Sequence, residues 1–359
     1  MKITRLTTDR LRVPVAGAVR IPLSGPKPAT SEAIDLILVH LETDAGIAGL
    51  GFTYLRGPGA AAVRGLIDNE MSLLVVGEDA SDAERLFAKV EARFRSVGFA
   101  GLGARAYTAI DIALWDLKAK AAAVPLFKLL GNAKASAPFF LSDVATLGRT
   151  ASEVVKLAKP LVKQGAMGVR VEVGSGDVQA DADRVREISD GLGEGASVSV
   201  AAEARFDLGT AEALTHFFED IGIDWFEDPI PTSDEIGYAK LAGLAEIPLA
   251  VGSSFDSRER FFRVLRSGVI RTVRPDLCRL GGITPLLKIA AVAEAYQTSV
   301  SPVRMTEIGV HLACGLAVVP HVDSVGWFAD LFTGGPTIED GKLVPSAEPG
   351  HGLNLASAM

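Results

Sequence analysis

A chain of 359 residues with 48% hydrophobic side chains is long enough for a barrel and a second domain, because one core rarely grows past about 250–300 residues. Its formal net charge of −8 argues against nucleic acid or an acidic membrane as a partner. Without an apolar run of about 18 residues or an apolar N-terminal stretch, neither a membrane span nor a signal peptide is expected, and two cysteines without metal-type spacing (Cys278 and Cys314) favour the reducing cytoplasm.

The N-terminal third predicts antiparallel strands followed by helices. Residues 33–52 hold two apolar runs joined by the turn signal TDAG, which is typical of a hairpin. A segment rich in Gly, Pro and Ser at 14–32 predicts a loop long enough to be a mobile flap. Helical periodicity then predicts a helix over 81–97 and, within 107–131, a largely buried helix that stops near Pro125, with Gly131 closing the last turn.

After residue 135 short β-branched or aromatic runs alternate with helical stretches. The runs lie at 137–142, 167–173, 198–203, 223–227, 248–252, 270–274 and 297–302. This alternation predicts parallel strands with helical crossovers, closed into a barrel. A doubly wound open sheet is the competing fold, but the segment GSGDVQAD is a poor version of the phosphate turn that it needs. A final strand and a tail that returns to the N-terminal domain are expected after residue 320.

Two successive runs end in an acid, Glu203 and Glu227, and the next run ends in Ser253. The carboxyl ends of parallel strands meet at the mouth of a barrel. Acids placed there are suited to share one hard cation. Five segments, TDAGIAGLG, AIDIALWDLKAK, WFEDP, RPDLCRLGGIT and IEDGKLVPSAEPGHGL, together resemble the enolase superfamily in its mandelate racemase and muconate lactonizing enzyme branch.

The resemblance implies an α/β fold, a modified TIM barrel (β/α)7β with an N-terminal α+β capping domain. The expected division is a capping domain with a mobile 20s loop at 1–130, the barrel at 131–325 and a C-terminal segment at 326–359 that returns to the capping domain. The implied activity is Mg²⁺-assisted abstraction of the proton α to the carboxylate of a small-molecule substrate. A homo-oligomer is implied as well.

The second barrel strand carries Arg170 and Glu172 where the family usually has two lysines, the second being the base. Arg170 can still donate to a carboxylate, but it stays charged and cannot act as a base. Glu172 could replace the lysine as base, or it could merely pair with Arg170 or Arg205. Both interpretations remain open.

The resemblance implies that Glu203, Glu227 and Ser253 stand at the three metal-ligand positions. Glu203 replaces an aspartate, and Ser253 replaces a carboxylate by a neutral, weak ligand. Magnesium often keeps several waters, so two acids could hold it with reduced affinity. Arg205 stands where an asparagine is usual, and it either points at the substrate or occupies the place of the metal.

Asp276 matches the aspartate of the family's histidine–aspartate dyad, but Val303 stands at the histidine position. The lysine of the muconate lactonizing type is absent too. Glu307 matches an acid that hydrogen-bonds the enolate when it is protonated. Arg304 could bind a second substrate anion, and Arg279 is a further candidate for substrate binding.

The leading hypothesis is a hydro-lyase that acts on an acid sugar or hydroxy acid, with Glu172 as base, Asp276 as the opposing acid and Arg170 as a carboxylate clamp. The arginines suit a substrate with more than one carboxylate or several hydroxyls. They are also compatible with a guanidinium that does part of the electrostatic work of the metal. The alternatives are a racemase, epimerase or cycloisomerase on the same scaffold, and a catalytically silent barrel that binds a small carboxylate.

Overall fold

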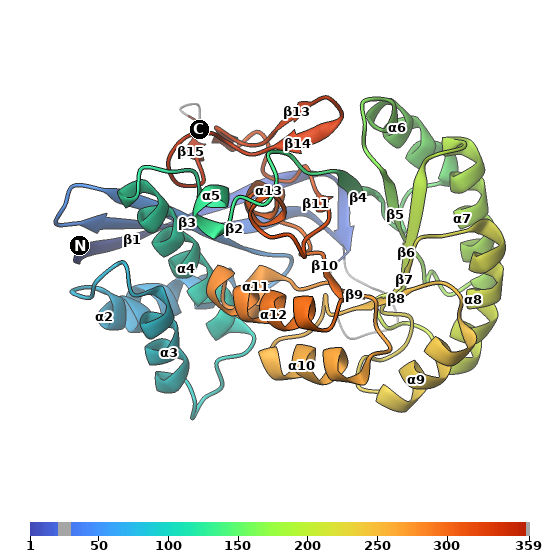
Figure 1. Ribbon diagram of the computed structural model, residues 1–359, viewed down its shortest axis with the longest axis horizontal. Helices are drawn as coiled ribbons and strands as arrows, with labels where there is room; N and C mark the ends of the chain where they lie inside the picture. Colours follow the sequence, from blue (N-terminus) through green and yellow to red (C-terminus); the bar gives the residue numbers. More distant parts are fainter. Residues whose placement is uncertain (21–29, 357–359) are drawn as a thin grey trace.

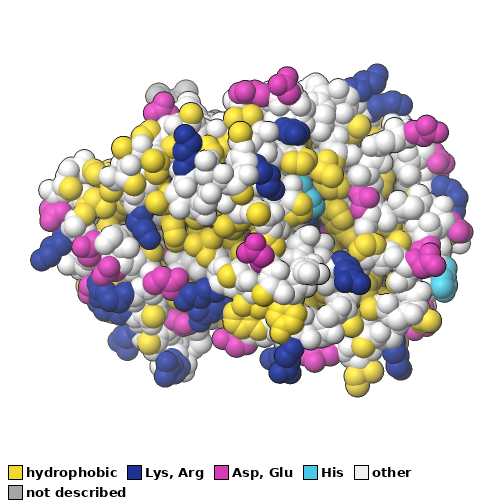
Figure 2. All heavy atoms as spheres, viewed as in Figure 1, with side chains coloured by type: hydrophobic (Ala, Val, Ile, Leu, Met, Phe, Trp, Pro, Cys, Tyr) yellow, Lys and Arg dark blue, Asp and Glu magenta, His cyan; other side chains and the backbone are white. Residues whose placement is uncertain are grey.

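The computed structural model describes residues 1–20 and 30–356, although not the side chains of 16–20 and 30–32. An antiparallel sheet with its helices lies beside a ring of strands and outer helices (Figure 1). Lys, Arg, Asp and Glu side chains are interspersed over the face in Figure 2. Within the described part, none of the helices combines the length and the apolar character that a membrane crossing requires.

The capping domain is built on three antiparallel strands in the order β1 (Ile3–Arg20), β2 (Thr30–Thr43) and β3 (Ala48–Leu55). Helix α4 packs directly on β3, because a Cβ atom at Gly51 would lie 2.0 Å from the Ala109 carbonyl oxygen. The helical elements of this domain are α1 (Ala60–Leu66), the π-helical η1 (Ile67–Met71), α2 (Ser72–Val75), α3 (Ala83–Arg93), α4 (Leu102–Ala121) and α5 (Leu126–Leu130).

One N-terminal prediction differs from the structure. The strands β1 and β2 extend further into the segment 14–32 than its composition indicates, and residues 21–29, the centre of the expected flap, lie outside the described residues. The predicted helical stop near Pro125 agrees with the structure, where α4 ends before this residue and the short helix α5 follows it up to Gly131.

Eight parallel strands form the barrel, in the order β11-β4-β5-β6-β7-β8-β9-β10. The end strand β10 contacts the segment that leads into the other end strand, because Val300 N donates to the Val318 carbonyl oxygen at 3.0 Å. The strands are β4 (Phe139–Ala145), β5 (Gly168–Glu172), β6 (Ser197–Ala201), β7 (Phe226–Glu227), β8 (Leu249–Val251), β9 (Thr272–Val273), β10 (Ser299–Val300) and β11 (Val322–Ser324). The predicted barrel of (β/α)7β type is confirmed.

Helices connect successive strands on the outside of the barrel (Figure 1). Several begin at a capping side chain: Thr150 and Glu153 form a capping box, and Asp177, Asp207 and Asp234 each accept a backbone N–H. The helices are α6 (Ala151–Lys163), α7 (Val178–Leu192), α8 (Leu208–Ile221), α9 (Glu235–Leu244), α10 (Arg258–Ser267), α11 (Leu277–Leu280), α12 (Ile283–Ala295) and α13 (Thr306–Gly315).

The C-terminal segment lies against the capping domain. His351 Nε2 is 2.7 Å from the Leu50 carbonyl oxygen, and His351 N donates to Asp116 Oδ1 at 3.0 Å. The rings of Phe332 and Phe52 pack 5.2 Å apart between centroids. The short strands of this segment are β12 (Phe332–Thr333), β13 (Thr337–Glu339), β14 (Lys342–Val344) and β15 (Asn354–Leu355), paired β12 with β15 and β13 with β14.

Candidate active site at the barrel mouth

Strand alternation decides which side chains face the inside of the barrel. Val169, Val171 and Val173 belong to the apolar cluster between strands and outer helices. Because successive side chains of a strand point to opposite faces, Arg170 and Glu172 point inward. The same alternation turns the following side chains inward from the other strands: Ser199, Trp225, Glu227, Arg274, Ser301, His321 and Asp323.

Two arginines hold the carboxylate of Glu227. Arg170 Nε donates to Glu227 Oε2 at 2.7 Å and Arg170 Nη2 donates to Glu227 Oε1 at 3.1 Å. Arg274 Nε lies 3.0 Å from the same Oε2 atom. Burial alone would raise the pKa of Glu227, but Arg170 and Arg274 lower it well below its usual value. Glu227 is therefore an ionised, fully engaged carboxylate.

Arg274 is buried inside the barrel, with 1% of its surface exposed, and contacts side chains from several strands. Besides its contact with Glu227, its Nη2 donates to Asp323 Oδ2 at 2.5 Å and its Nη1 donates to Ser301 Oγ at 2.7 Å. Its guanidinium also lies 5.5 Å from the ring centroid of Trp225. The sequence analysis did not select Arg274 or Asp323.

Glu172 has a buried carboxylate oxygen without a hydrogen-bond partner, a property that it shares with Glu307 and Asp323. Its side chain is buried, its Oε1 lies 4.0 Å from Arg170 Nη1, and its Oε2 has no hydrogen-bond partner. Arg170 donates two hydrogen bonds to Glu227, so Glu172 is only a distant ion partner of this arginine. A buried carboxylate oxygen without a partner is unusual and calls for a function.

Glu203 and Arg205 form an ion pair just after strand β6. Arg205 Nη1 also donates to the Val173 carbonyl oxygen at 2.7 Å, which fixes the guanidinium beside strand β5. Burial alone would raise the pKa of Glu203, but Arg205 and Arg56 lower it. One oxygen that a metal ion would need is thus bound to a guanidinium.

Left-handed backbone gathers at this end of the barrel. Glu203, Ala204, Asp228, Arg304 and Met305 have φ angles of 49°, 61°, 42°, 60° and 48°. All five lie within five residues after the end of a barrel strand, and they are a majority of the nine such non-glycine residues in the described part of the chain. Such strain persists where the surroundings impose it, and it clusters at functional sites.

Asp276 is held on both oxygens. Tyr54 Oη donates to Oδ2 at 2.9 Å, Arg304 Nη1 lies 3.3 Å from the same oxygen, and Cys278 N donates to Oδ1 at 2.9 Å. Burial alone would raise the pKa of Asp276, but Arg304 and Arg105 lower it below its usual value. Asp276 is therefore a carboxylate at neutral pH in the ligand-free protein.

The capping domain contributes Tyr54 and Arg56 to the mouth. Arg105 holds the backbone at Tyr54, because its Nη1 donates to the Tyr54 carbonyl oxygen at 3.0 Å. Burial and Arg304 lower the pKa of Arg56 to about 10, while Glu203 and Glu172 raise it. Arg56 thus stays charged at neutral pH and lies within electrostatic reach of both acids. No local motif marks these two residues in the sequence.

Ser253, an expected metal ligand, donates its hydroxyl to Asp228 Oδ2 at 2.8 Å, and Gly252 N donates to Oδ1 at 3.3 Å. Burial and then the neighbouring Glu227 raise the pKa of Asp228 to about 7. Sequence reasoning overlooked Asp228, although it directly follows Glu227. The Ser253 oxygen is oriented by this bond.

The structure does not bring Glu307 and Arg279 into the same network. Glu307 lies in the first turn of α13, its Oε2 has no partner, and burial raises its pKa to about 7. Arg279 Nη1 lies 3.5 Å from the Ser254 carbonyl oxygen, the limit of a hydrogen bond. Arg304, by contrast, lies within the network through Asp276.

The donor atoms present do not fit a magnesium site of the kind that the resemblance implies. Both oxygens of Glu227 contact arginine, Glu203 is paired with Arg205, and Ser253 is engaged by Asp228. Magnesium needs a near-octahedral set of free oxygens. Among residues 1–20 and 30–356, no three His, Cys, Asp or Glu side chains are grouped to hold a metal ion.

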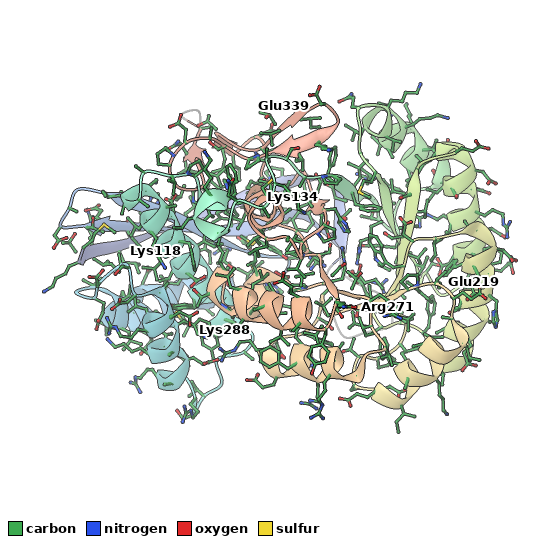
Figure 3. The ribbon with its side chains drawn as sticks, viewed as in Figure 1. Lys118, Lys134, Glu219, Arg271, Lys288 and Glu339 are labelled. Atoms are coloured by element: carbon green, nitrogen blue, oxygen red, sulfur yellow. The ribbon has the colours of Figure 1, made fainter. Side chains whose placement is uncertain are left out.

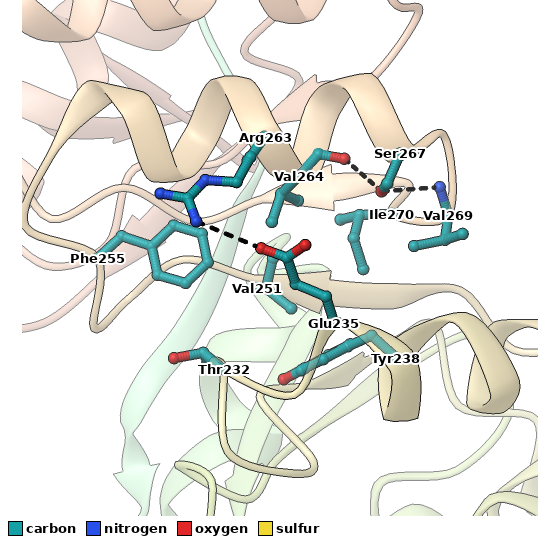
Figure 4. A pocket seen from close by; sticks show the side chains of 10 residues that line it. All are labelled: Thr232, Glu235, Tyr238, Val251, Phe255, Arg263, Val264, Ser267, Val269 and Ile270. Atoms are coloured by element: carbon teal, nitrogen blue, oxygen red, sulfur yellow. Dashed lines mark hydrogen bonds and ion pairs between the residues drawn. The ribbon is translucent and has the colours of Figure 1, made fainter.

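Two hollows lie away from these side chains. One lies between α9 and α10 and is lined by apolar side chains that include Val251, Phe255 and Ile270. Glu235 and Arg263 form an ion pair of 3.6 Å across it (Figure 4). The other lies nearby, around Pro248. Neither contains a residue expected in the site.

Two family models match the chain: the mandelate racemase/muconate lactonizing enzyme N-terminal domain at residues 12–131 and the enolase C-terminal domain-like model at residues 153–359. L-talarate/galactarate dehydratase of Salmonella typhimurium is 29% identical over 350 residues, which cover 96% of this chain and 86% of that protein. The 3,6-anhydro-alpha-L-galactonate cycloisomerase of Streptomyces coelicolor is 28% identical, with 98% and 97% covered.

Solved structures show the same architecture. L-talarate dehydratase from Polaromonas sp. JS666, complexed with Mg and L-glucarate, superposes with a TM-score of 0.90 at 30% identity and covers 99% of this chain and 95% of that one. The magnesium implied by the resemblance is thus present in a relative. In this chain, guanidinium groups contact Glu203 and Glu227.

Proposed function

Because the chain belongs to the mandelate racemase and muconate lactonizing enzyme family of the enolase superfamily, we propose that it is a hydro-lyase that removes water from an acid sugar. The observation that carries this proposal is the unpartnered Oε2 of Glu172 at the end of β5. In the cyclic strand order β5 and β9 are four positions apart, so Asp276, which follows β9, stands opposite Glu172. Two acids on opposite sides of one substrate suit proton abstraction and leaving-group protonation.

In the proposed reaction, Glu172 takes the proton from the carbon α to the substrate carboxylate. The C–H electron pair moves into that carboxylate and gives an enediolate. Nearby cations, Arg170 and Arg56, stabilise its charge. The electrons then return to form the Cα–Cβ double bond as the β-hydroxyl leaves with a proton from Asp276, and the enol product becomes a 2-keto acid.

Asp276 must gain a proton for this role, although its pKa is low in the ligand-free protein. Arg304 is the charge that lowers this pKa most. A substrate carboxylate that binds Arg304 would offset that charge and raise the pKa of Asp276. Substrate binding itself therefore prepares the acid. A substrate with two carboxylates suits this arrangement, since one would lie beside Glu172 and the other at Arg304.

The experiment that tests the proposal is a turnover assay in D₂O with galactarate, L-talarate, L-glucarate, galactonate and 3,6-anhydro-α-L-galactonate. Dehydration predicts a 2-keto acid, detectable by its semicarbazone absorbance. Exchange of the α-proton without loss of water would instead support a racemase or epimerase, and rearrangement of an anhydro sugar would support a cycloisomerase, the activity of the Streptomyces relative. If ligand binds but neither turnover nor exchange occurs, the protein is a catalytically silent barrel that binds a small carboxylate.

We further propose that the protein is a cytoplasmic homo-oligomer. Its two cysteines, Cys278 and Cys314, are buried and unpaired, as a reducing compartment permits. Leu73 and Val97, on the capping domain, expose 77% and 78% of their surfaces. Light scattering during size-exclusion chromatography tests the assembly, and a single monomeric peak would contradict it.

A further inference from the structure

The carboxylates at the metal-ligand positions of this barrel already have cationic partners. Arg170 and Arg274 hold Glu227, and Arg205 holds Glu203. Resting on the proposed function, we propose that these three guanidinium groups take the electrostatic place of the divalent ion, so that the mouth binds the carboxylate of its acid sugar without magnesium.

The contacts within this cluster support the exchange. Three carboxylates, Glu203, Glu227 and Asp323, contact three guanidinium groups, so these charges balance without a metal ion. A magnesium ion could bind Glu203 or Glu227 only by displacing an arginine from a buried acid. The displaced guanidinium would lose an ionic partner in a buried place, which is unfavourable.

The geometry leaves one donor of Arg170 available. Its Nε and Nη2 are bound to Glu227, which fixes the plane of the guanidinium. Its Nη1 lies 4.0 Å from Glu172 Oε1. A substrate carboxylate that accepts a hydrogen bond from Nη1 would therefore lie next to the proposed base. Because the two hydrogen bonds to Glu227 fix the plane of the guanidinium, the direction in which Nη1 can donate to the substrate carboxylate is fixed as well.

Arg274 has the positioning role. It does not need to touch the substrate, because Asp323 and Ser301 fix its other end. It neutralises Glu227 Oε2 and so keeps that acid from attracting a cation or a proton. Arg274 lies two residues before Asp276, at the end of β9. A neutral side chain in place of Arg274 would leave Glu227 with Arg170 as its remaining arginine partner.

The test is isothermal titration calorimetry of the full-length protein with MgCl₂ alone and with galactarate and L-glucarate, in EDTA and in excess magnesium. We expect no magnesium binding and ligand affinities that agree within about twofold in the two buffers. Magnesium binding to the wild type that Glu227→Gln abolishes, or ligand binding only with magnesium, would overturn the inference. If no acid sugar binds in either buffer, the proposed function fails, and the magnesium titration still decides the present inference.

Arg274→Gln is the informative variant, with Arg271→Gln as its matched control, since Arg271 lies just before β9 on the same segment (Figure 3) and is exposed. Arg274→Gln should weaken ligand binding about tenfold and allow magnesium to bind. Arg271→Gln should change neither. Ligand affinity unchanged in Arg274→Gln would contradict the positioning role. If Arg274→Gln does not fold, the wild-type comparison between EDTA and magnesium decides alone.

Discussion

Arg274 provides the sharpest stability test of the buried network. Its Nη2 lies 2.5 Å from Asp323 and its Nε 3.0 Å from Glu227, all three side chains being almost completely buried. Removing one partner of a buried ion pair leaves an uncompensated charge and costs about 3–5 kcal/mol. Arg274→Gln and Asp323→Asn should therefore each lower the free energy of unfolding by about this amount.

The double variant should lose about 1–3 kcal/mol less than the sum of the single losses, because the second substitution removes a charge that the first left unpaired. Urea unfolding, followed by circular dichroism and by the fluorescence of Trp225 beneath Arg274, measures all four proteins. The control Arg271→Gln should stay within about 0.5 kcal/mol of the wild type. Additive single losses, or a loss below about 1 kcal/mol for Arg274→Gln, would refute the reasoning.

Three further predictions concern other parts of the molecule. Burial raises the pKa of Glu307 from 4.5 to about 7, so between these pH values the folded state binds more protons than the unfolded state, and stability falls as the pH rises. Glu307→Gln should abolish this part of the fall in the urea midpoint with pH, and an unchanged dependence of the midpoint on pH would contradict the prediction. Tyr54→Phe removes the hydroxyl that donates to Asp276, so unfolding should need about 1–3 kcal/mol less and kcat should fall more than KM changes; steady-state kinetics that match the wild type would contradict this. Gly51→Ala should cost about 1–3 kcal/mol, since its Cβ would lie 2.0 Å from the Ala109 carbonyl oxygen, and an unchanged thermal midpoint would contradict it.

The sequence predicts the barrel well because its signals are local. Each buried strand is a short apolar run and each crossover is a helical stretch, so the alternation is visible without knowledge of contacts. The break between α4 and α5 is harder to place, because the apolar pattern continues past it and only Pro125 marks the stop. The extended ends of β1 and β2 are hidden by the Gly and Pro content of the segment between them.

The site was only partly predictable for a different reason. Strand-end acids such as Glu203 and Glu227 are visible because their neighbours are apolar. Arg274 could have been found by counting back two residues from Asp276 along an alternating strand. Tyr54 and Arg56 have no such signal, since they meet the barrel only after the capping domain has packed on its mouth. That Arg170 pairs with Glu227 on a distant strand rather than with Glu172 also depends on the folded arrangement.

The central claim is that the free oxygen of Glu172 removes the α-proton, and isotope exchange measures this step directly. Proton NMR of an acid sugar in D₂O should show loss of the α-proton signal with the wild type. The exposed-site control Glu339→Gln, on β13 (Figure 3), should behave like the wild type. Glu172→Gln should keep the fold and slow this exchange by about 10²–10⁴-fold. Exchange at the wild-type rate in Glu172→Gln would contradict the account.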